Sequence, residues 1–509
     1  MLSRTLCYTL SGIDGIKITV ECNLSNGLPA FELVGLPDIA VKEARERIKS
    51  ALRNTGFEFP TDRLVINLAP ADIKKESTAF DLPIAIAILA CCKHVNPESI
   101  SNIAIMGELA LNGEIRPIRG ALPLVISARA DKIKTVIIPS SNAKEVMCVE
   151  GIDIIPAGTL MQVVSHLSGK RKIEPLKTVS YAQLLGERIY SSDFKSVKGQ
   201  KSAKRALIIA ASGGHNVLMV GPPGSGKTLM ARCVPSILPD MTFEEALITT
   251  RIHSVAGSIP EKGLLVERPF RAPHHTASHV SIVGGGVHAV PGEISKAHNG
   301  VLFLDELPEY RRDVLEALRQ PMEDGFVTIT RVAAQSTYPS EFMLICSMNP
   351  CPCGNYGSRT RQCRCTPLDI KRYLSRISGP LLDRIDMHIE VESIPPEKLA
   401  DEKEGESSSE IRQRVEAARE IQRERYKDES ITCNARLSAT TLNHYCRLNR
   451  EAKQVMNAAS EKMGLSNRAY TRVLKVARTI ADLEGEKDIS VNHVSEALQY
   501  RMIDAKYWG

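Results

Sequence analysis

The chain has 509 residues, a formal net charge of +6 and 13 cysteines. Its length exceeds what one ordinary core supports, so we expect two to four domains. The odd number of cysteines, with Cys91 and Cys92 adjacent in an apolar run, favours a reducing compartment over a disulfide framework. That apolar run, residues 82–92, is the longest in the chain but too short to span a bilayer, and the N-terminus does not resemble a signal peptide. We therefore expect a cytoplasmic protein with no membrane partner, and the modest positive charge permits a nucleic-acid partner.

Residues 1–168 mix two kinds of pattern, which predicts an α+β domain. Strand-like alternation covers residues 16–22, 64–68 and 134–138, and a helical pattern covers residues 39–55. The order of three further segments resembles the Lon protease domain, which has a ribosomal S5 domain 2-like fold. These segments are residues 105–109, 113–118 and 133–139.

The resemblance to Lon does not extend to the catalytic residues of that family. Lon-type proteolysis needs a serine nucleophile and a lysine that takes its proton. The position of the lysine is Leu122 here, and the segment from Lys75 to Asp81, around the expected serine, lacks the glycines of the family. We therefore expect the fold without the catalytic dyad, and not a protease. A role in binding or in organising a ring follows as a hypothesis.

Composition shifts divide the rest of the chain. A basic, polar stretch begins a linker over residues 169–195, and we assign residues 196–393 to one α/β domain. An acidic, serine-rich segment with a proline pair predicts a second linker over residues 394–410. Residues 411–509 show a helical pattern with little strand signal, which predicts a helical domain.

A phosphate-binding motif opens the middle domain. The octapeptide GPPGSGKT follows an apolar run, residues 217–220, and matches G-x-x-x-x-G-K-[ST] without a mismatch. In such a loop backbone N–H groups surround the phosphates, the lysine reaches the β and γ oxygens, and the last hydroxyl can hold Mg²⁺. The sequence therefore predicts ATP and Mg²⁺ as cofactors. The loop consists of Gly221, Pro222, Pro223, Gly224, Ser225, Gly226, Lys227 and Thr228.

A second apolar run ends in two carboxylates. Residues 301–304 are typical of a buried parallel strand, and Asp305 and Glu306 follow directly. Asp305 is suited to complete the Mg²⁺ shell with Thr228, and Glu306 to orient or deprotonate the attacking water. The pair predicts hydrolysis of the nucleotide and not binding alone.

Two segments of the middle domain have weaker signals. His274, His275 and His279 are close in sequence, but no acidic residue or cysteine adjoins them, so we expect polar loop contacts and not a metal site. Within residues 325–339, the side chains from Val327 to Arg331 alternate between apolar and polar, which predicts a β-hairpin.

Four cysteines follow in two closely spaced pairs. Cys351 and Cys353 form one C-x-C pair, and Cys363 and Cys365 form another after nine intervening residues. Four thiolates can close a tetrahedral, structural Zn²⁺ site. Because C-x-C is tighter than the usual spacing, free thiols or a redox pair stay open as alternatives.

The segment around these cysteines is basic. Its positive residues are Arg359, Arg361, Arg364, Lys371, Arg372 and Arg376. Only Asp369 opposes them between residues 355 and 376, so the segment could follow the phosphates of a nucleic acid in a salt-dependent way. Aromatic residues make up only 5% of the chain, so a platform that stacks successive bases is not expected. A solvated charged surface without a partner is the alternative.

Long matches in the same order along nearly the whole chain resemble the ComM/YifB family of magnesium chelatase-like AAA+ ATPases. They lie at residues 268–286, 291–309, 347–357, 378–391 and 468–485. The resemblance implies an AAA+ core with a parallel sheet, a helical lid at the C-terminus, and assembly into a homo-hexamer.

The resemblance also implies roles for single residues. Asn349 matches the first sensor, which helps to position the water, and Arg384 matches the arginine finger, which reaches the nucleotide of the neighbouring subunit. Arg468 matches the second sensor on the lid, with Arg472 as a rival one turn later. Arg331 falls where related replicative helicases carry a basic residue on a hairpin that enters the pore and contacts DNA.

Two functions are compatible with this resemblance. The first is an ATP-driven DNA helicase that performs branch migration during recombination of transforming DNA. Its partners would be single-stranded, forked or branched DNA and recombination proteins such as a recombinase. The second is a protein-remodelling ATPase like the ATPase subunit of magnesium chelatase. The candidate DNA contacts are Arg331, Arg359, Arg361 and Arg364.

Overall fold

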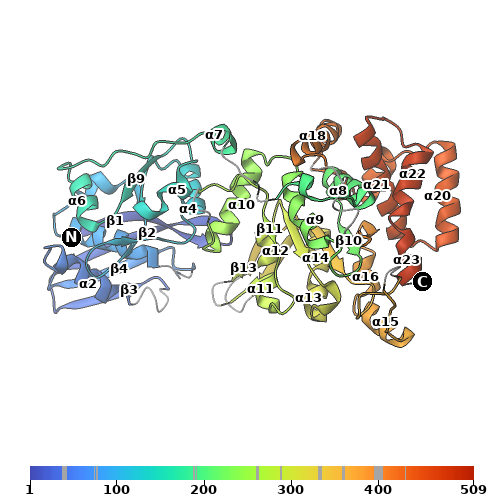
Figure 1. Ribbon diagram of the computed structural model, residues 1–509. Helices are drawn as coiled ribbons and strands as arrows, with labels where there is room; N and C mark the ends of the chain where they lie inside the picture. Colours follow the sequence, from blue (N-terminus) through green and yellow to red (C-terminus); the bar gives the residue numbers. More distant parts are fainter. Residues whose placement is uncertain are drawn as a thin grey trace.

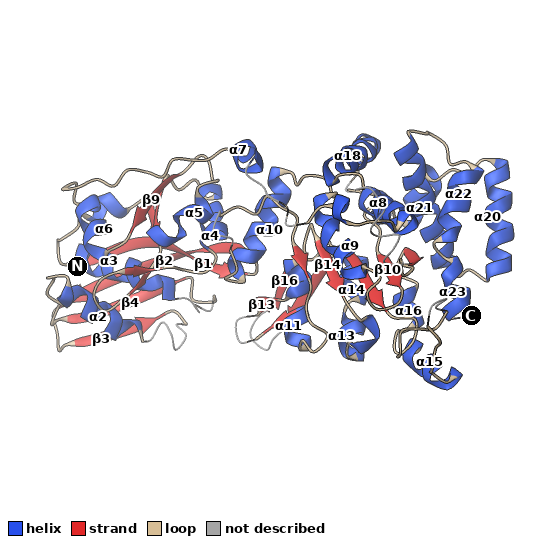
Figure 2. Cartoon of the chain, in the orientation of Figure 1, coloured by secondary structure: helices blue, strands red, loops and turns tan. Residues whose placement is uncertain are grey.

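The computed structural model describes residues 1–36, 43–73, 75, 78–186, 190, 192–259, 263–286, 289–330, 335–357, 361–394, 405–429 and 431–508. Two sheets and a group of helices follow one another along the chain (Figure 1). Figure 2 shows the described strands in the N-terminal and middle parts and helices in the C-terminal part. The predicted α/β class with several domains is confirmed.

A seven-stranded mixed sheet forms the N-terminal domain. Its strands are β1 (Leu2–Ser11), β2 (Asp14–Ser25), β3 (Ala30–Val34), β4 (Arg63–Ala69), β5 (Ile103–Ile105), β8 (Thr135–Pro139) and β9 (Asp153–Ala157). Their order is β3-β4-β2-β1-β5-β8-β9. The β1–β2 and β2–β4 pairs are antiparallel and the other neighbours are parallel. This mixture fits the α+β domain predicted from the sequence.

Helices cover this sheet. They are α2 (Ala44–Asn54), α3 (Asp81–Cys91), α4 (Ala121–Ala130), α5 (Ala143–Val146) and α6 (Leu160–Leu167), and a small hairpin joins β6 (Glu108–Leu109) to β7 (Ile115–Arg116). Every residue of α3 is buried, so the longest apolar run of the chain is a core helix. Within the described ranges, no helix combines the length and apolar character needed to cross a membrane.

Five parallel strands form the centre of the middle domain. They are β10 (Val217–Val220), β11 (Phe270–Arg271), β14 (Val301–Leu304), β17 (Met343–Met348) and β18 (Met387–Glu390). Their order is β11-β14-β17-β10-β18, and each neighbouring pair is parallel. Ligands bind at the carboxyl ends of such strands. Both β10 and β14 run directly into a predicted site segment at this edge.

Short helices and two hairpins surround the parallel sheet. The helices are α8 (Lys201–Gly213), α9 (Lys227–Cys233), α10 (Phe243–Val255), α11 (His279–Val283), α12 (Glu293–Lys296), α13 (Arg312–Ala317), α14 (Arg319–Asp324), α15 (Pro367–Leu374) and α16 (Gly379–Leu382). Helix α7 (Tyr181–Gly186) precedes them and packs its Leu184 in the N-terminal apolar cluster. The hairpins pair β12 (Gly284–Gly285) with β13 (Val290–Pro291), and β15 (Phe326–Thr330) with β16 (Gln335–Pro339). The second hairpin occupies the segment in which the alternating pattern predicts one.

The C-terminal domain is helical. It contains α18 (Ser408–Arg425), α19 (Ala439–Tyr445), α20 (Arg450–Met463), α21 (Asn467–Glu484), α22 (Val491–Gln499) and α23 (Met502–Tyr507). The Ser407 hydroxyl accepts from the Glu410 N–H, and the Glu410 carboxylate accepts from the Ser407 N–H at 2.8 Å. This capping box starts α18 inside the serine-rich segment assigned to a linker, because serine and glutamate at this spacing satisfy the first N–H groups of a helix.

Helix α10 of the middle domain also belongs to the N-terminal core. Its residue Ala246 and the nearby Met241 and Leu264 pack in the same apolar cluster as α4. Arg251 donates to the Ile13 carbonyl oxygen at 2.8 Å. The two domains therefore share packed surface in addition to the connecting segment.

Candidate functional site

The phosphate-binding loop connects β10 to α9. Gly224 and Gly226 have φ angles of 76° and 87°, the left-handed region that glycine adopts without strain. A Cβ at either position would meet open space, so backbone conformation requires glycine there. At Gly221 the reason is crowding, because a Cβ would lie 2.3 Å from the carbonyl oxygen of Val391, which follows β18. The strand order of the sheet, which places β18 beside β10, is thus a second reason for a glycine in this loop.

Lys227 is buried at the start of α9. Its Nζ donates to the carbonyl oxygens of Gly221 at 2.7 Å and Pro222 at 2.9 Å, and lies 3.4 Å from Asn349 Oδ1. Burial lowers the pKa of Lys227 to about 8, and the nearby Asp305 carboxylate opposes this shift. The predicted first sensor therefore lies beside the lysine that is expected to contact the phosphates.

The two predicted Mg²⁺ ligands lie side by side. The Thr228 hydroxyl donates to Asp305 Oδ2 at 2.9 Å, and the Ser347 hydroxyl donates to the other oxygen of Asp305. A hydroxyl and a carboxylate are oxygen ligands that suit Mg²⁺. Ser225 Oγ is buried and has no hydrogen-bond partner among the described residues, so the loop retains a donor for a phosphate oxygen.

Glu306 has a strained backbone next to this pair. Its φ of 54° lies in the left-handed region, which costs a residue other than glycine on the order of 1–3 kcal/mol and is typical of functional sites. Its side chain is 55% exposed, and its Oε2 lies 3.6 Å from His275 Nδ1. The carboxylate is therefore accessible to a water and oriented by one neighbouring ring.

The contact between His275 and Glu306 fits the expected polar loop contacts, with an acidic partner that is distant in sequence. Since β11 and β14 are adjacent and parallel, the segments that follow them meet at one edge of the sheet. The ring of His275 also packs edge-on against Tyr310, whose hydroxyl donates to the Pro273 carbonyl oxygen at 2.6 Å. Spacing along the chain carries no signal for this contact, whereas an assignment of the strand order would have revealed it.

Arg384 lies between α16 and β18 and is only 4% exposed. One terminal nitrogen donates to the Pro380 carbonyl oxygen at 2.7 Å, and the other lies 2.7 Å from Glu323 Oε1 at the end of α14. Its Nε is buried without a partner in the described part of the chain. Arg384 is therefore a buried residue whose acidic partner is Glu323, and not a surface arginine.

Arg468 and Arg472, the two candidates for the second sensor, have different surroundings on α21. The Arg468 side chain is 57% exposed and lies 3.7 Å from the same Glu323 oxygen. Arg472 pairs at 2.8 Å with Asp386, which is completely buried, and so links the lid to the core. Arg384 and Arg468 thus converge on one carboxylate, and neither contacts the phosphate-binding loop within the described ranges.

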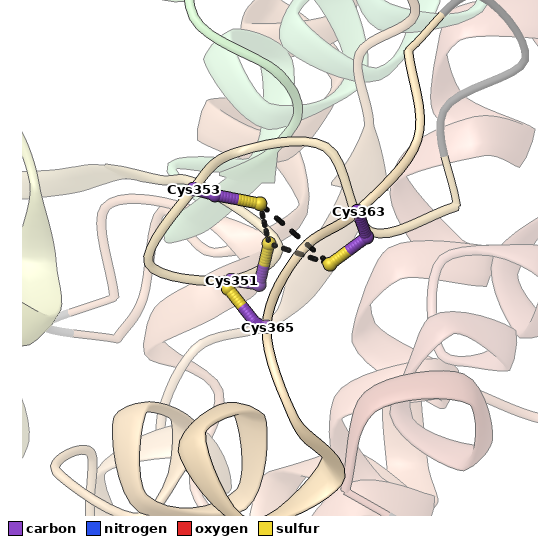
Figure 3. A group of neighbouring side chains, drawn as sticks. All are labelled: Cys351, Cys353, Cys363 and Cys365. Atoms are coloured by element: carbon purple, nitrogen blue, oxygen red, sulfur yellow. Dashed lines mark hydrogen bonds between the residues drawn. The ribbon is translucent and has the colours of Figure 1, made fainter.

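The four predicted cysteine ligands converge (Figure 3). Their sulfur atoms all lie within 4.8 Å of one another. The Sγ–Sγ distances are 3.4 Å for Cys351 and Cys353, 3.7 Å for Cys351 and Cys363, and 3.6 Å for Cys353 and Cys363. The backbone N–H of Tyr356 donates to Cys351 Sγ at 3.3 Å. Two C-x-C pairs from one loop thus form a single group of thiols.

A basic cavity lies beside these thiols. Its volume is about 540 Å³, and its lining includes Cys353, Cys365, Arg364, Arg372 and Arg376. Arg376 pairs with Glu309 at 2.9 Å. The candidate DNA contacts Arg361 and Arg364 are exposed. The other two candidates, Arg331 and Arg359, lie outside the described residues.

Three family models match consecutive parts of the chain. A model described as subunit ChlI of Mg-chelatase covers residues 20–142, one for magnesium chelatase subunit ChlI covers residues 193–399, and one for the ChlI C-terminal region covers residues 405–501. The chain is therefore similar to magnesium chelatase subunits through all its domains.

Known proteins show similarity over the full length. The chain is 44% identical to the competence protein ComM of Haemophilus influenzae over 508 residues, which cover 98% of each protein. It is 43% identical to the protein YifB of Escherichia coli, over 99% of this chain and 98% of YifB. A distant match to Lon protease 2 of Bacillus subtilis is 27% identical over 192 residues, 35% of this chain and 34% of that protein. The chain thus belongs to the ComM/YifB family of magnesium chelatase-like AAA+ proteins.

Proposed function

We propose that the chain is an ATP-driven DNA motor that assembles as a homo-hexamer and performs branch migration during recombination, including that of transforming DNA. The observation that carries hydrolysis is the position of Glu306, which is strained, accessible to water and adjacent to the predicted Mg²⁺ ligands. In this proposal Glu306 orients the water and accepts its proton, and Asn349 holds the water near the γ-phosphate.

The binding residues act on the phosphates. Lys227 exchanges its two carbonyl partners for the β and γ oxygens, whose negative charge stabilises the ammonium group that burial disfavours. Mg²⁺ held by Thr228 and Asp305 would neutralise charge on the same oxygens. The N–H groups of the glycine-rich loop bind the remaining phosphate oxygens.

The buried arginine supports assembly into a ring. In the single chain Arg384 is held by Glu323, close to Arg468. We propose that both arginines act on the nucleotide of the adjacent subunit, where a phosphate replaces Glu323 as the anionic partner. Arg468 is the better second sensor, because Arg472 is already occupied by buried Asp386. A chain without neighbours would then lack part of its catalytic apparatus.

DNA as the substrate is supported by two observations. The relative from Haemophilus influenzae bears the name competence protein. The candidate contacts Arg361 and Arg364 are exposed, and Arg364 lines the cavity beside the cysteines. The hairpin β15–β16 flanks the segment that contains Arg331, and we propose that Arg331 reaches a pore from there. Single-stranded, forked or branched DNA, followed along its backbone, is the proposed partner, and recombination proteins would act on the same DNA.

A protein client is the second candidate, because the matching family models describe subunits of magnesium chelatase. In this case the ring would remodel a protein partner. Both candidates use the same hydrolytic site, so the site itself does not separate them.

The ATPase rate with and without DNA distinguishes the two functions. Single-stranded, duplex and forked DNA are added at fixed moderate salt, with Glu306→Gln as the blank. A DNA motor should be stimulated, and the Arg331→Ala and Arg361→Ala variants should lose stimulation. Arg447→Ala, an equal loss of charge at an exposed position of the lid, serves as the control. A rate indifferent to every DNA, with no DNA binding, would favour the protein client.

A further inference from the structure

The sulfur spacing in the cysteine cluster matches a metal site. Zinc–thiolate bonds of 2.3 Å in a tetrahedron place the sulfur atoms about 3.8 Å apart, whereas a disulfide joins them at about 2.05 Å. The three measured separations among Cys351, Cys353 and Cys363 are 3.4 to 3.7 Å. Cys365 completes a group of four within 4.8 Å. The thiols therefore have the separation of ligands around one ion.

We propose that the four clustered cysteines bind one Zn²⁺ and that this ion braces the phosphate-binding loop and the first sensor. Binding is a ligand exchange without redox change: four thiols lose their protons to solvent, and four thiolates replace water on the ion. The product carries a charge of −2. Arg364 and Arg372, which line the adjoining cavity, provide compensating positive charge.

Two contacts connect the cluster to the nucleotide site. Asn349 lies two residues before Cys351, and its Oδ1 is 3.4 Å from Lys227 Nζ. Gly354, in the turn after Cys353, lies directly against Pro223 of the phosphate-binding loop, because a Cβ at Gly354 would be 2.5 Å from Pro223 Cδ.

The metal would hold this turn in place. The Gly354 N–H donates to the Cys351 carbonyl oxygen at 2.9 Å, and the φ of Gly354 is 78°. Without a metal, only the intervening backbone links this turn covalently to the second C-x-C pair. Loss of the ion should therefore loosen the support of Pro223 and Asn349 and weaken nucleotide binding. This second part of the proposal rests on the proposed nucleotide site, whereas the zinc site itself does not.

Zinc content is the first test. The full chain, purified under reducing conditions and analysed by mass spectrometry for metals, should contain about one Zn²⁺ per chain. The double variant Cys353→Ser/Cys363→Ser should contain none. Cys92→Ser, which removes a partly exposed thiol of the N-terminal domain, should retain the metal. A metal-free wild type that also takes up no added Zn²⁺, or zinc retained in the double variant, would overturn the site.

Nucleotide affinity is the second test, measured with a fluorescent ATP analogue. The double variant should bind about tenfold more weakly, or 1.4 kcal/mol, and Cys92→Ser should bind normally. If the double variant does not fold, Gly354→Ala provides the test, because it keeps the four ligands but displaces Pro223. Gly354→Ala should keep its zinc and bind nucleotide about tenfold more weakly. Unchanged nucleotide affinity in the zinc-free double variant would overturn the brace. If only Gly354→Ala folds, unchanged affinity in that variant would overturn it. Either result would leave the zinc site and the ATPase proposal intact.

Discussion

Leu122 in the N-terminal domain and Lys227 in the AAA+ core are both buried, but one side chain is apolar and the other is charged. At the position of the Lon lysine the N-terminal domain has Leu122, which is completely buried in its core. In the AAA+ core Lys227 is also buried, but burial lowers its pKa to about 8, so the fold carries a destabilising charge. The comparison teaches that apolar packing fills the position of Leu122, whereas the AAA+ core tolerates an unfavourable charge at the site where we propose that phosphates bind.

A second difference concerns unsatisfied polar groups. The AAA+ core has an unpartnered Ser225 hydroxyl and an unpartnered Arg384 Nε within its described residues. Beside Leu122 the polar groups are satisfied: its N–H donates to Glu145 at 2.9 Å, and Glu145 also accepts from Ser254 of α10. This part of the N-terminal domain therefore supports a domain interface, and substitutions in the two regions should affect different quantities.

Replacing Glu306, the proposed catalytic base, should have the largest effect. Glu306→Gln keeps the shape of the side chain but removes the base, so turnover should fall about 10³-fold while ATP binding persists. Phosphate release measures the rate, and equilibrium binding measures the affinity. Glu309→Gln, three residues later and exposed, should retain turnover. Normal turnover in Glu306→Gln would remove hydrolysis from this carboxylate.

Arg384→Ala should reduce turnover about 10³-fold, because a guanidinium that neutralises charge on the γ-phosphate has an effect of this size or larger in other enzymes. The turnover of Glu323→Gln, which releases the arginine without removing it, should stay within about threefold of wild type.

Mixing Arg384→Ala with Lys227→Ala separates the roles of the two residues. Rings containing both variants should recover some activity, since Lys227→Ala supplies the arginine finger and Arg384→Ala supplies the nucleotide site. Equal inactivity of the mixture and of each variant would place the arginine in its own subunit's site.

Leu122→Ala tests whether Leu122 stabilises the N-terminal domain by packing alone. The cavity should lower the free energy of unfolding of this domain by about 2–4 kcal/mol, measured by chemical denaturation followed by circular dichroism. Leu111→Ala, at an exposed position of the same domain, is the control and should cost little. ATP turnover below the melting transition should not change. A loss of turnover in folded Leu122→Ala would show that the two regions are energetically coupled through α10.

Features carried by neighbouring residues could be predicted from the sequence, and those that depend on strand order could not. The phosphate-binding loop and the Asp305–Glu306 pair each follow one apolar run, so local patterns were sufficient. The approach of Val391 to Gly221 requires β18 to lie beside β10, and the contact of Arg384 with Glu323 joins two elements far apart in sequence. Such contacts depend on the order in which the chain enters the sheet, which periodicity does not encode.

His275 sharpens the comparison because its contact with Glu306 is tertiary and is expected to affect the rate of ATP turnover. Its ring nitrogen lies 3.6 Å from the Glu306 carboxylate, and its ring is held against Tyr310. His275→Ala should leave ATP affinity unchanged and lower turnover about tenfold, the effect of losing one orienting contact of roughly 1.4 kcal/mol. His275→Gln, which retains a donor, should recover part of the rate, and His444→Ala, an exposed histidine of the lid, should have none of these effects. If His275→Ala and His275→Gln both turn over at the wild-type rate, the strained backbone alone orients Glu306. The AAA+ core would then position its carboxylate as the N-terminal domain positions Leu122, through packing of the chain without a polar partner.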